Sequence, residues 1–137
     1  MTAGYSATPL PKKLGIKQGH RVALLAPPRD FELELPEGTT LHRGGRGQQP
    51  FDVMLLFVKR AADLYARFAP AAKKLQQNGG LWIAWPKKAS GMQTDVGEAL
   101  VREYGLAQGL VDNKICAVDE TWSGLRFVIR VKDRPKR

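Results

Sequence analysis

The fold of this chain is decided by one stretch, Gly79-Gly80-Leu81-Trp82-Ile83-Ala84-Trp85-Pro86-Lys87-Lys88-Ala89-Ser90-Gly91. Its first half, two glycines and then an apolar run, predicts a turn that leads into a short, fully buried strand. Its second half, from Pro86 onward, predicts a stiff basic loop at the carboxyl end of that strand. Ligand sites of α/β sheets lie at the carboxyl ends of the strands. We therefore expect the preceding residues to build the sheet beneath this loop and the following residues to close its far edge.

The composition of the 137-residue chain is that of one ordinary globular domain. Apolar residues make up 43% of it and charged residues 26%, which excludes the disordered and membrane-spanning classes. No apolar run has the length of a bilayer span, and the first residues lack the basic-then-apolar order of a signal peptide. We expect a cytoplasmic protein without membrane contact. Cys116 is the single cysteine, and its apolar neighbours predict a core residue rather than a reactive thiol.

The formal net charge is +9, which is high for this length. Part of it lies in a basic C-terminal tail at residues 132–137, which we separate from one domain at residues 1–131. A basic surplus favours anionic partners, whether a small phosphate-bearing molecule, nucleic acid or an acidic protein. The alternative is a solvated tail and a soluble surface.

Apolar runs between turn residues predict the strands. The early strands are 21–26, 39–42 and 51–57, followed by the strand after Asn78-Gly79-Gly80. Two final strands, 111–118 and 125–131, have too short a connection for anything but an antiparallel hairpin.

Helical periodicity extends from residue 61 to 75, where Pro70 should kink or split the helix. Asp30 can cap a short helix through Leu35, and Thr94 is the expected N-cap of a later helix. A helical turn is also expected at residues 9–14, after an extended N-terminal segment at residues 1–8. The alternation of strands and helices predicts a three-layer α/β sheet with right-handed crossovers.

The second half of the chain resembles the later part of a class I methyltransferase fold. The resemblance lies in the strand that begins Phe51-Asp52-Val53, the Gly79-Gly80 turn into the next strand, and the terminal hairpin. It implies a Rossmann-like, mostly parallel sheet with strand order 2-1-3-4-6-5 and a C-terminal antiparallel hairpin. The cofactor positions differ, because Ala26-Pro27-Pro28 stands where glycines would approach a cofactor and His42-Arg43 where an acidic residue would hold its ribose. We therefore expect no bound cofactor.

The whole chain is also similar to a bacterial family of domains of unknown function, numbered 3052. That family has no established activity, so the resemblance assigns no catalytic residue. The matching stretches are Gly4-Tyr5-Ser6, Lys12-Lys13-Leu14-Gly15-Ile16-Lys17, Phe51-Asp52-Val53, Ala84-Trp85-Pro86-Lys87-Lys88 and Val118-Asp119-Glu120-Thr121-Trp122-Ser123-Gly124-Leu125.

The carboxyl ends of the parallel strands should share one edge and form a ligand crevice. The segments expected there are 27–30, 43–46, 59–60, 85–90 and 119–123. The candidate ligand-binding residues among them are Lys87, Lys88, Ser90, Asp119, Glu120, Trp122, Arg43 and Arg46.

Each group of candidates has a second interpretation. Lys87 and Lys88 could capture an anion or form an exposed basic turn. Arg43 and Arg46 could wrap a phosphate or belong to a mobile loop. Asp119 and Glu120 could pair with the lysines, or Asp119 could hold the hairpin turn.

Trp122 could likewise stack on a ligand ring or cap the core. His20 and His42 have no cluster of ligands at metal spacing, so we expect no metal site. No Ser-His-Asp or Cys-His arrangement can be singled out either.

Three functions remain open. The first is a non-catalytic module that binds an anionic small molecule or an acidic partner at the carboxyl edge. The second is a diverged methyltransferase-like enzyme without the glycine-rich motif. The third is nucleic-acid binding through the basic loops and tail. Neither the oligomeric state nor the identity of a ligand follows from the sequence.

Overall fold

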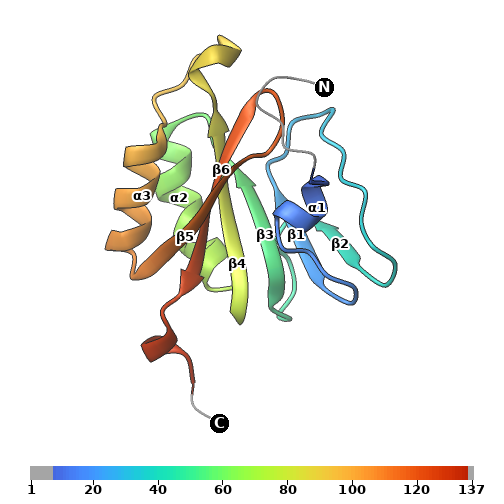
Figure 1. The fold of residues 1–137 in the computed structure, drawn as a ribbon. Helices are drawn as coiled ribbons and strands as arrows, with labels where there is room; N and C mark the ends of the chain where they lie inside the picture. The colour runs from blue at the N-terminus through green and yellow to red at the C-terminus, as the bar shows by residue number, and fades with distance from the viewer. Residues whose placement is uncertain (1–7, 136–137) are drawn as a thin grey trace.

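Six strands form one sheet in the order β2-β1-β3-β4-β6-β5, as Figure 1 shows. The computed structural model describes residues 8–135. The observed order of the strands confirms the predicted order 2-1-3-4-6-5. The strands are β1 (Arg21–Leu25), β2 (Thr40–Arg43), β3 (Phe51–Phe57), β4 (Leu75–Pro86), β5 (Leu110–Ala117) and β6 (Trp122–Ile129).

Three α-helices accompany the sheet within residues 8–135: α1 (Leu10–Lys13), α2 (Ala61–Ala72) and α3 (Glu98–Ala107). Two short 3-10 helices, η1 (Lys88–Ser90) and η2 (Val131–Asp133), follow β4 and β6. No helix in this part of the chain is long and apolar enough to cross a membrane. Residues 1–7 of the expected extended segment lie outside the described residues. The last two residues of the basic tail, 136–137, lie outside them as well.

The directions of the strands bring five carboxyl ends to one edge. Strands β1 to β4 pair in parallel, whereas β6 is antiparallel to both β4 and β5. Since two reversals restore the direction, β5 runs parallel to β4. The predicted C-terminal antiparallel hairpin is confirmed.

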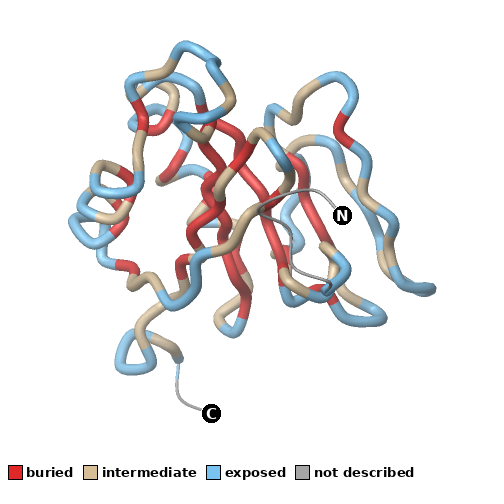
Figure 2. Tube along the Cα trace, turned by 45° about the horizontal axis from the view of Figure 1, so that its top comes forward, coloured by how far each residue is buried: buried red, intermediate tan, exposed pale blue. Residues whose placement is uncertain are grey.

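Each face of the sheet has its own core. Met54 and Leu56 of β3 belong to the core beneath α2 and α3, whereas Val53 and Leu55 belong to the opposite core, which α1 covers. All four side chains are at most 1% exposed. In Figure 1, α2 and α3 lie together on one side of the sheet and α1 lies on the other. Figure 2 shows the same burial concentrated along the central strands.

The second core is closed partly by an extended segment instead of a helix. The predicted helix from Asp30 to Leu35 is wrong, because residues 31–36 have no regular secondary structure. Phe31, Leu33 and Leu35 pack against this core while the glutamates between them are exposed. When every second residue is apolar, the apolar side chains lie on the same side only if the chain is extended. The alternation therefore outweighed the capping potential of Asp30.

Two predicted boundaries were also wrong. Gly79 and Gly80 lie inside β4 rather than before it, where the register between β3 and β4 shifts. A Cβ on Gly79 would lie 2.7 Å from the Asp52 carbonyl oxygen, so the close approach of two backbones requires glycine there. Pro70 lies in the last turn of α2 and does not split the helix, which continues to Ala72.

The second boundary is the start of α3. The helix begins at Glu98 with Gly97 as its N-cap, three residues later than an N-cap at Thr94 predicted. Thr94 instead accepts a hydrogen bond from the Val96 N–H at 3.0 Å, which makes a local turn. Asp95 accepts one from the Ala61 N–H at 2.8 Å and so caps α2, a different helix.

Candidate functional site

A cleft of about 860 Å³ opens at the carboxyl edge of the sheet. It lies where β1 and β3 end, and the chain leaves β1 toward β2 on one side and β3 toward β4 on the other. This is the point at which the strand order reverses, and α/β sheets bind their ligands there. The residues that line the cleft are Ala26, Pro27, Pro28, Arg29, Asp30, Phe31, Phe57, Lys59, Arg60, Asp63, Arg67, Met92, Gln93, Asp119, Thr121 and Trp122.

Aromatic rings form the apolar part of the cleft. Phe57 ends β3 and contacts Phe31 and Trp122 edge to face, with ring centroids 4.9 and 5.0 Å apart. All three rings are at least 94% buried, so they act first as packing residues of the second core. Their interlocking fixes the cleft wall, because edge-to-face pairs favour one relative orientation.

Charged side chains surround these rings. Arg60 pairs with Asp63 at 3.3 Å in an exposed contact. Asp119 accepts hydrogen bonds from the N–H groups of Thr121 and Trp122, both at 2.8 Å, and thereby holds the hairpin turn. These two carboxylates are thus engaged by the protein itself.

Three cations of the cleft have no carboxylate partner among residues 8–135. Arg29, Lys59 and Arg67 take part in none of the ion pairs found in that span. Asp30 is the remaining acidic residue of the lining. The cleft therefore presents a surplus of positive charge to a ligand.

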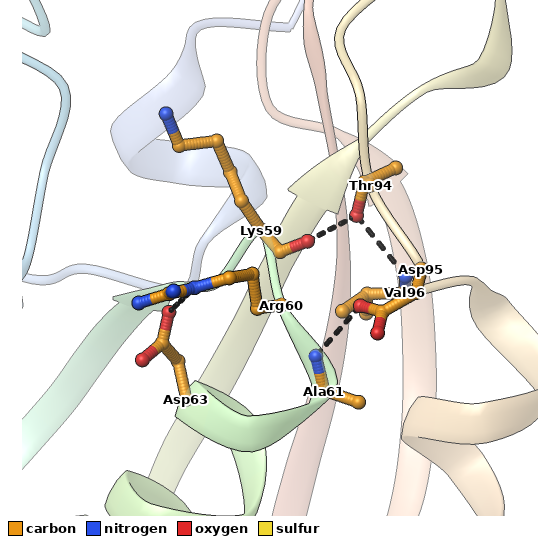
Figure 3. A network of polar contacts seen from close by, with 7 residues as sticks. All are labelled: Lys59, Arg60, Ala61, Asp63, Thr94, Asp95 and Val96. Atoms are coloured by element: carbon orange, nitrogen blue, oxygen red, sulfur yellow. Dashed lines mark hydrogen bonds and ion pairs between the residues drawn. The ribbon is translucent and has the colours of Figure 1, made fainter.

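A hydrogen-bond network anchors the wall on which Lys59 lies (Figure 3). The Thr94 hydroxyl donates to the Lys59 carbonyl oxygen at 2.5 Å, and Asp95 caps α2 just beyond it. The start of α2 is thereby tied to the segment that follows η1. Figure 3 shows the Lys59 side chain extending away from Thr94, so the backbone is held while the ammonium group stays available.

The turn after β1 has an unusual backbone. Ala26 has φ +54°, and it is the only non-glycine residue with positive φ in the described chain. That conformation costs an L-residue about 1–2 kcal/mol relative to the right-handed region. Residues in such conformations cluster at functional sites, and this one lines the cleft.

The structure brings only some of the candidate residues to this cleft. Asp119 and Trp122 line it. Glu120 is exposed next to them and is not part of the lining. Arg43 and Arg46 are exposed near the end of β2 and also lie outside it.

The loop after β4 does not line the cleft either. The Lys87 N–H donates to the Thr121 carbonyl oxygen at 2.8 Å, and the Ser90 hydroxyl donates to the Lys87 carbonyl oxygen at 2.6 Å. Lys88 is exposed at the start of η1. The backbone of this loop is therefore hydrogen-bonded to the hairpin turn, and its side chains lie outside the cleft lining.

Sequence reasoning missed the contribution of α2. Asp63 and Arg67 line the cleft from the first turns of this helix, whereas only the segment 59–60 was expected there. The signal was the helical spacing of Asp63 and Arg67, which lie four residues apart and so share one face of α2.

Neither a search for metal-binding clusters nor a comparison with known proteins assigns a function to the cleft. Within the described residues, no three His, Cys, Asp or Glu side chains gather in a way that could hold a metal ion. No protein-family model matches the chain, and no curated protein is found to be similar to it. The resemblances to the family numbered 3052 and to class I methyltransferases therefore stay predictions.

Proposed function

We propose that this protein is a non-catalytic, Rossmann-like module that binds a small anionic molecule in the cleft at the carboxyl edge of its sheet. The observation that carries the proposal is the position of the cleft at the reversal of strand order, where Arg29, Lys59 and Arg67 converge. The general rule for α/β sheets places ligands at this point.

The chemistry of the lining favours a phosphate or carboxylate group. The guanidinium groups of Arg29 and Arg67 can each donate two parallel hydrogen bonds to such a group. The N-terminus of α2 lies at the same edge, but the Asp95 carboxylate already caps it, so the attraction for an anion comes from the side-chain cations. Phe57 and Trp122 line the same cleft and, although almost fully buried, make part of its lining apolar.

A diverged methyltransferase-like enzyme is the second candidate, and one observation favours it. Ala26 keeps a left-handed backbone at the position where cofactor-binding sheets carry glycine. The shape of such a turn is present although the residue type is not. S-Adenosylmethionine therefore belongs among the ligands that are tested.

The test is a thermal-shift screen of the purified full chain. Nucleotides, sugar phosphates, small aromatic carboxylates, S-adenosylmethionine and an acidic peptide are compared at two salt concentrations. A ligand present at a hundred times its dissociation constant should stabilise the fold by about 2.7 kcal/mol. We expect a shift from a small anion, and a shift from the peptide alone would contradict the proposal.

Two charge-matched variants then locate the site. Arg29→Gln with Lys59→Gln should abolish the shift, because both cations line the cleft. Lys87→Gln with Lys88→Gln removes the same charge outside the cleft and should leave the shift unchanged. The reverse result would move the site to the loop after β4.

A further inference from the structure

A second basic region lies on the face of the sheet that α1 covers, away from α2 and α3. A groove of about 500 Å³ runs between α1 and β5, and the described residues of its lining include three lysines and no carboxylate. The lining residues are Thr8, Lys12, Lys13, Lys114, Ile115, Cys116 and Ala117. The carboxyl-edge cleft shares none of them.

Two of these lysines are held in place by backbone carbonyl groups. The Lys13 ammonium donates to the Ala117 carbonyl oxygen at 2.7 Å, and the Lys114 ammonium donates to the Lys13 carbonyl oxygen at 3.0 Å. An ammonium group has three protons, so each retains donors for a ligand. The lysines are thus positioned, and neither has its charge neutralised by these contacts.

Arginines continue the positive charge onto β6. Arg126 stands opposite Lys114 in the antiparallel register of β5 and β6, so both side chains lie on the same face. Its guanidinium lies where a Cβ on Gly80 would be, above the backbone of β4. Burial and the nearby Arg134 lower the pKa of Arg126 below its ordinary value.

These arginines lack the partner that partly buried charges normally have. The ion pairs among residues 8–135 involve Arg60 and Arg102, and none involves Arg126, Arg130 or Arg134. The Nε of Arg130 is buried and has no hydrogen-bond partner in the part of the chain that the structure describes. A group of half-desolvated cations without carboxylates is a cost to the fold that an external anion would offset.

We propose that this basic face, made of Lys12, Lys13, Lys114, Arg126 and Arg134, binds the phosphate backbone of a nucleic acid. This surface differs from the segment with Arg43 and Arg46 that the sequence suggested, which lies at the end of β2, at the opposite edge of the sheet.

The length of the basic face favours a polymer over a small anion. At about 3.3 Å per residue, the distance from Ala117, which Lys13 contacts, to Lys114 on β5 is about 10 Å. The chain from Arg126 toward Arg134 continues the row, and the three remaining residues of β6 alone add about 10 Å. A nucleic acid strand offers a phosphate about every 3.4 Å along its helix axis. Protein partners usually bury aromatic or aliphatic anchors, and among the described residues of the groove lining Ile115 is the one large hydrophobic residue that is well exposed.

The test is the binding of single-stranded DNA and RNA oligonucleotides to the full chain, measured by fluorescence anisotropy over a range of salt concentrations. Lys12→Gln with Lys114→Gln removes two exposed cations of the basic face. Each lost phosphate contact should make the negative slope of log affinity against log salt concentration shallower by about 0.7. Together they should weaken binding at least about tenfold at 0.1 M salt.

The matched control is Arg43→Gln with Arg46→Gln, which makes the same change of net charge at the opposite edge. We expect it to bind within about twofold of the unaltered chain. Equal losses in the two variants would overturn the proposal, because binding would then depend on net charge alone. No binding at low salt would overturn it as well.

Cys116 provides an independent readout, because it is the single cysteine and lines the groove. A saturating oligonucleotide should slow the reaction of its thiol with an uncharged maleimide at least about fivefold. An unchanged rate at saturation would place the nucleic acid elsewhere and refute the assignment. Polyglutamate of matched length should bind more weakly, and equal affinity would overturn the choice of a phosphodiester partner.

Discussion

Gly105 in α3 offers the sharpest test of how the helices are placed on the sheet. In an isolated helix, glycine is less favourable than alanine by about 1 kcal/mol. From helix propensity alone, Gly105→Ala should therefore stabilise the protein. The packing of α3 against β6 predicts the opposite sign.

The reason is the contact between Gly105 and Phe127. A Cβ on Gly105 would overlap three atoms of the Phe127 ring, all closer than 3.0 Å. The ring is fully buried and is held by an edge-to-face contact with Phe68 at 5.4 Å, so it cannot retreat. Overpacking of this kind costs about 3 kcal/mol at the upper end of its usual range. After the gain in propensity, the net loss should be about 2 kcal/mol.

Urea unfolding followed by far-ultraviolet circular dichroism measures this loss directly. For a domain of this size, a loss of 2 kcal/mol should also lower Tm by about 8 °C. A double-mutant cycle with Phe127→Leu tests the mechanism, because the smaller side chain makes room for the new methyl group. We expect a favourable coupling of at least about 1 kcal/mol. If Gly105→Ala instead raised stability by about 1 kcal/mol, α3 would not lie over β6 as described.

Three further predictions concern single residues. Ala26→Gly should raise the free energy of unfolding by about 0.5–1 kcal/mol, because relief of the left-handed backbone outweighs the added chain entropy of glycine; a loss of stability in urea unfolding would show that the turn is unstrained. Asp95→Ala should lower it by about 1 kcal/mol by removing the cap of α2, whereas Asp95→Asn should retain most of the stability; equal losses would argue against capping. Burial raises the pKa of the Cys116 thiol, and the neighbouring lysines offset this only in part. The rate of alkylation of the Cys116 thiol should therefore be low at neutral pH and rise only in alkaline solution; full reactivity at pH 7 would contradict this. The contribution of the protonated thiol to stability is lost as the pH rises through the folded-state pKa.

The main sheet could be predicted because its signals are local or topological. The apolar run of β3 and the short connection between β5 and β6 each leave one reasonable structure, and both are present. The carboxyl edge as a place for a cleft follows from strand direction alone. The extended segment from Phe31 to Leu35 was missed although its alternation was visible, because the capping signal of Asp30 was given more weight.

The residues that line the cleft could be predicted only in part. Segment 27–30 and residues 59–60 were expected at this edge and line the cleft, but Lys87 and Lys88 were preferred as ligands. The direction of a loop after a strand depends on what holds its backbone. Here the bond from the Lys87 N–H to the hairpin turn decides it, and the two partners are more than thirty residues apart in the chain.

The amino-acid sequence by itself determined the class of fold, the strand order implied by resemblance, and the surplus of positive charge, since these depend on patterns within short windows and on composition. Only the tertiary structure decided which charges are neutralised and which are left for a ligand. Asp95 caps a helix that begins 34 residues earlier, and the Asp119 carboxylate accepts hydrogen bonds from the backbone of its own hairpin turn. Arg126, in contrast, meets another arginine and no carboxylate. Electrostatic interactions depend on distance and burial, and both are set only when segments distant in the chain are packed together.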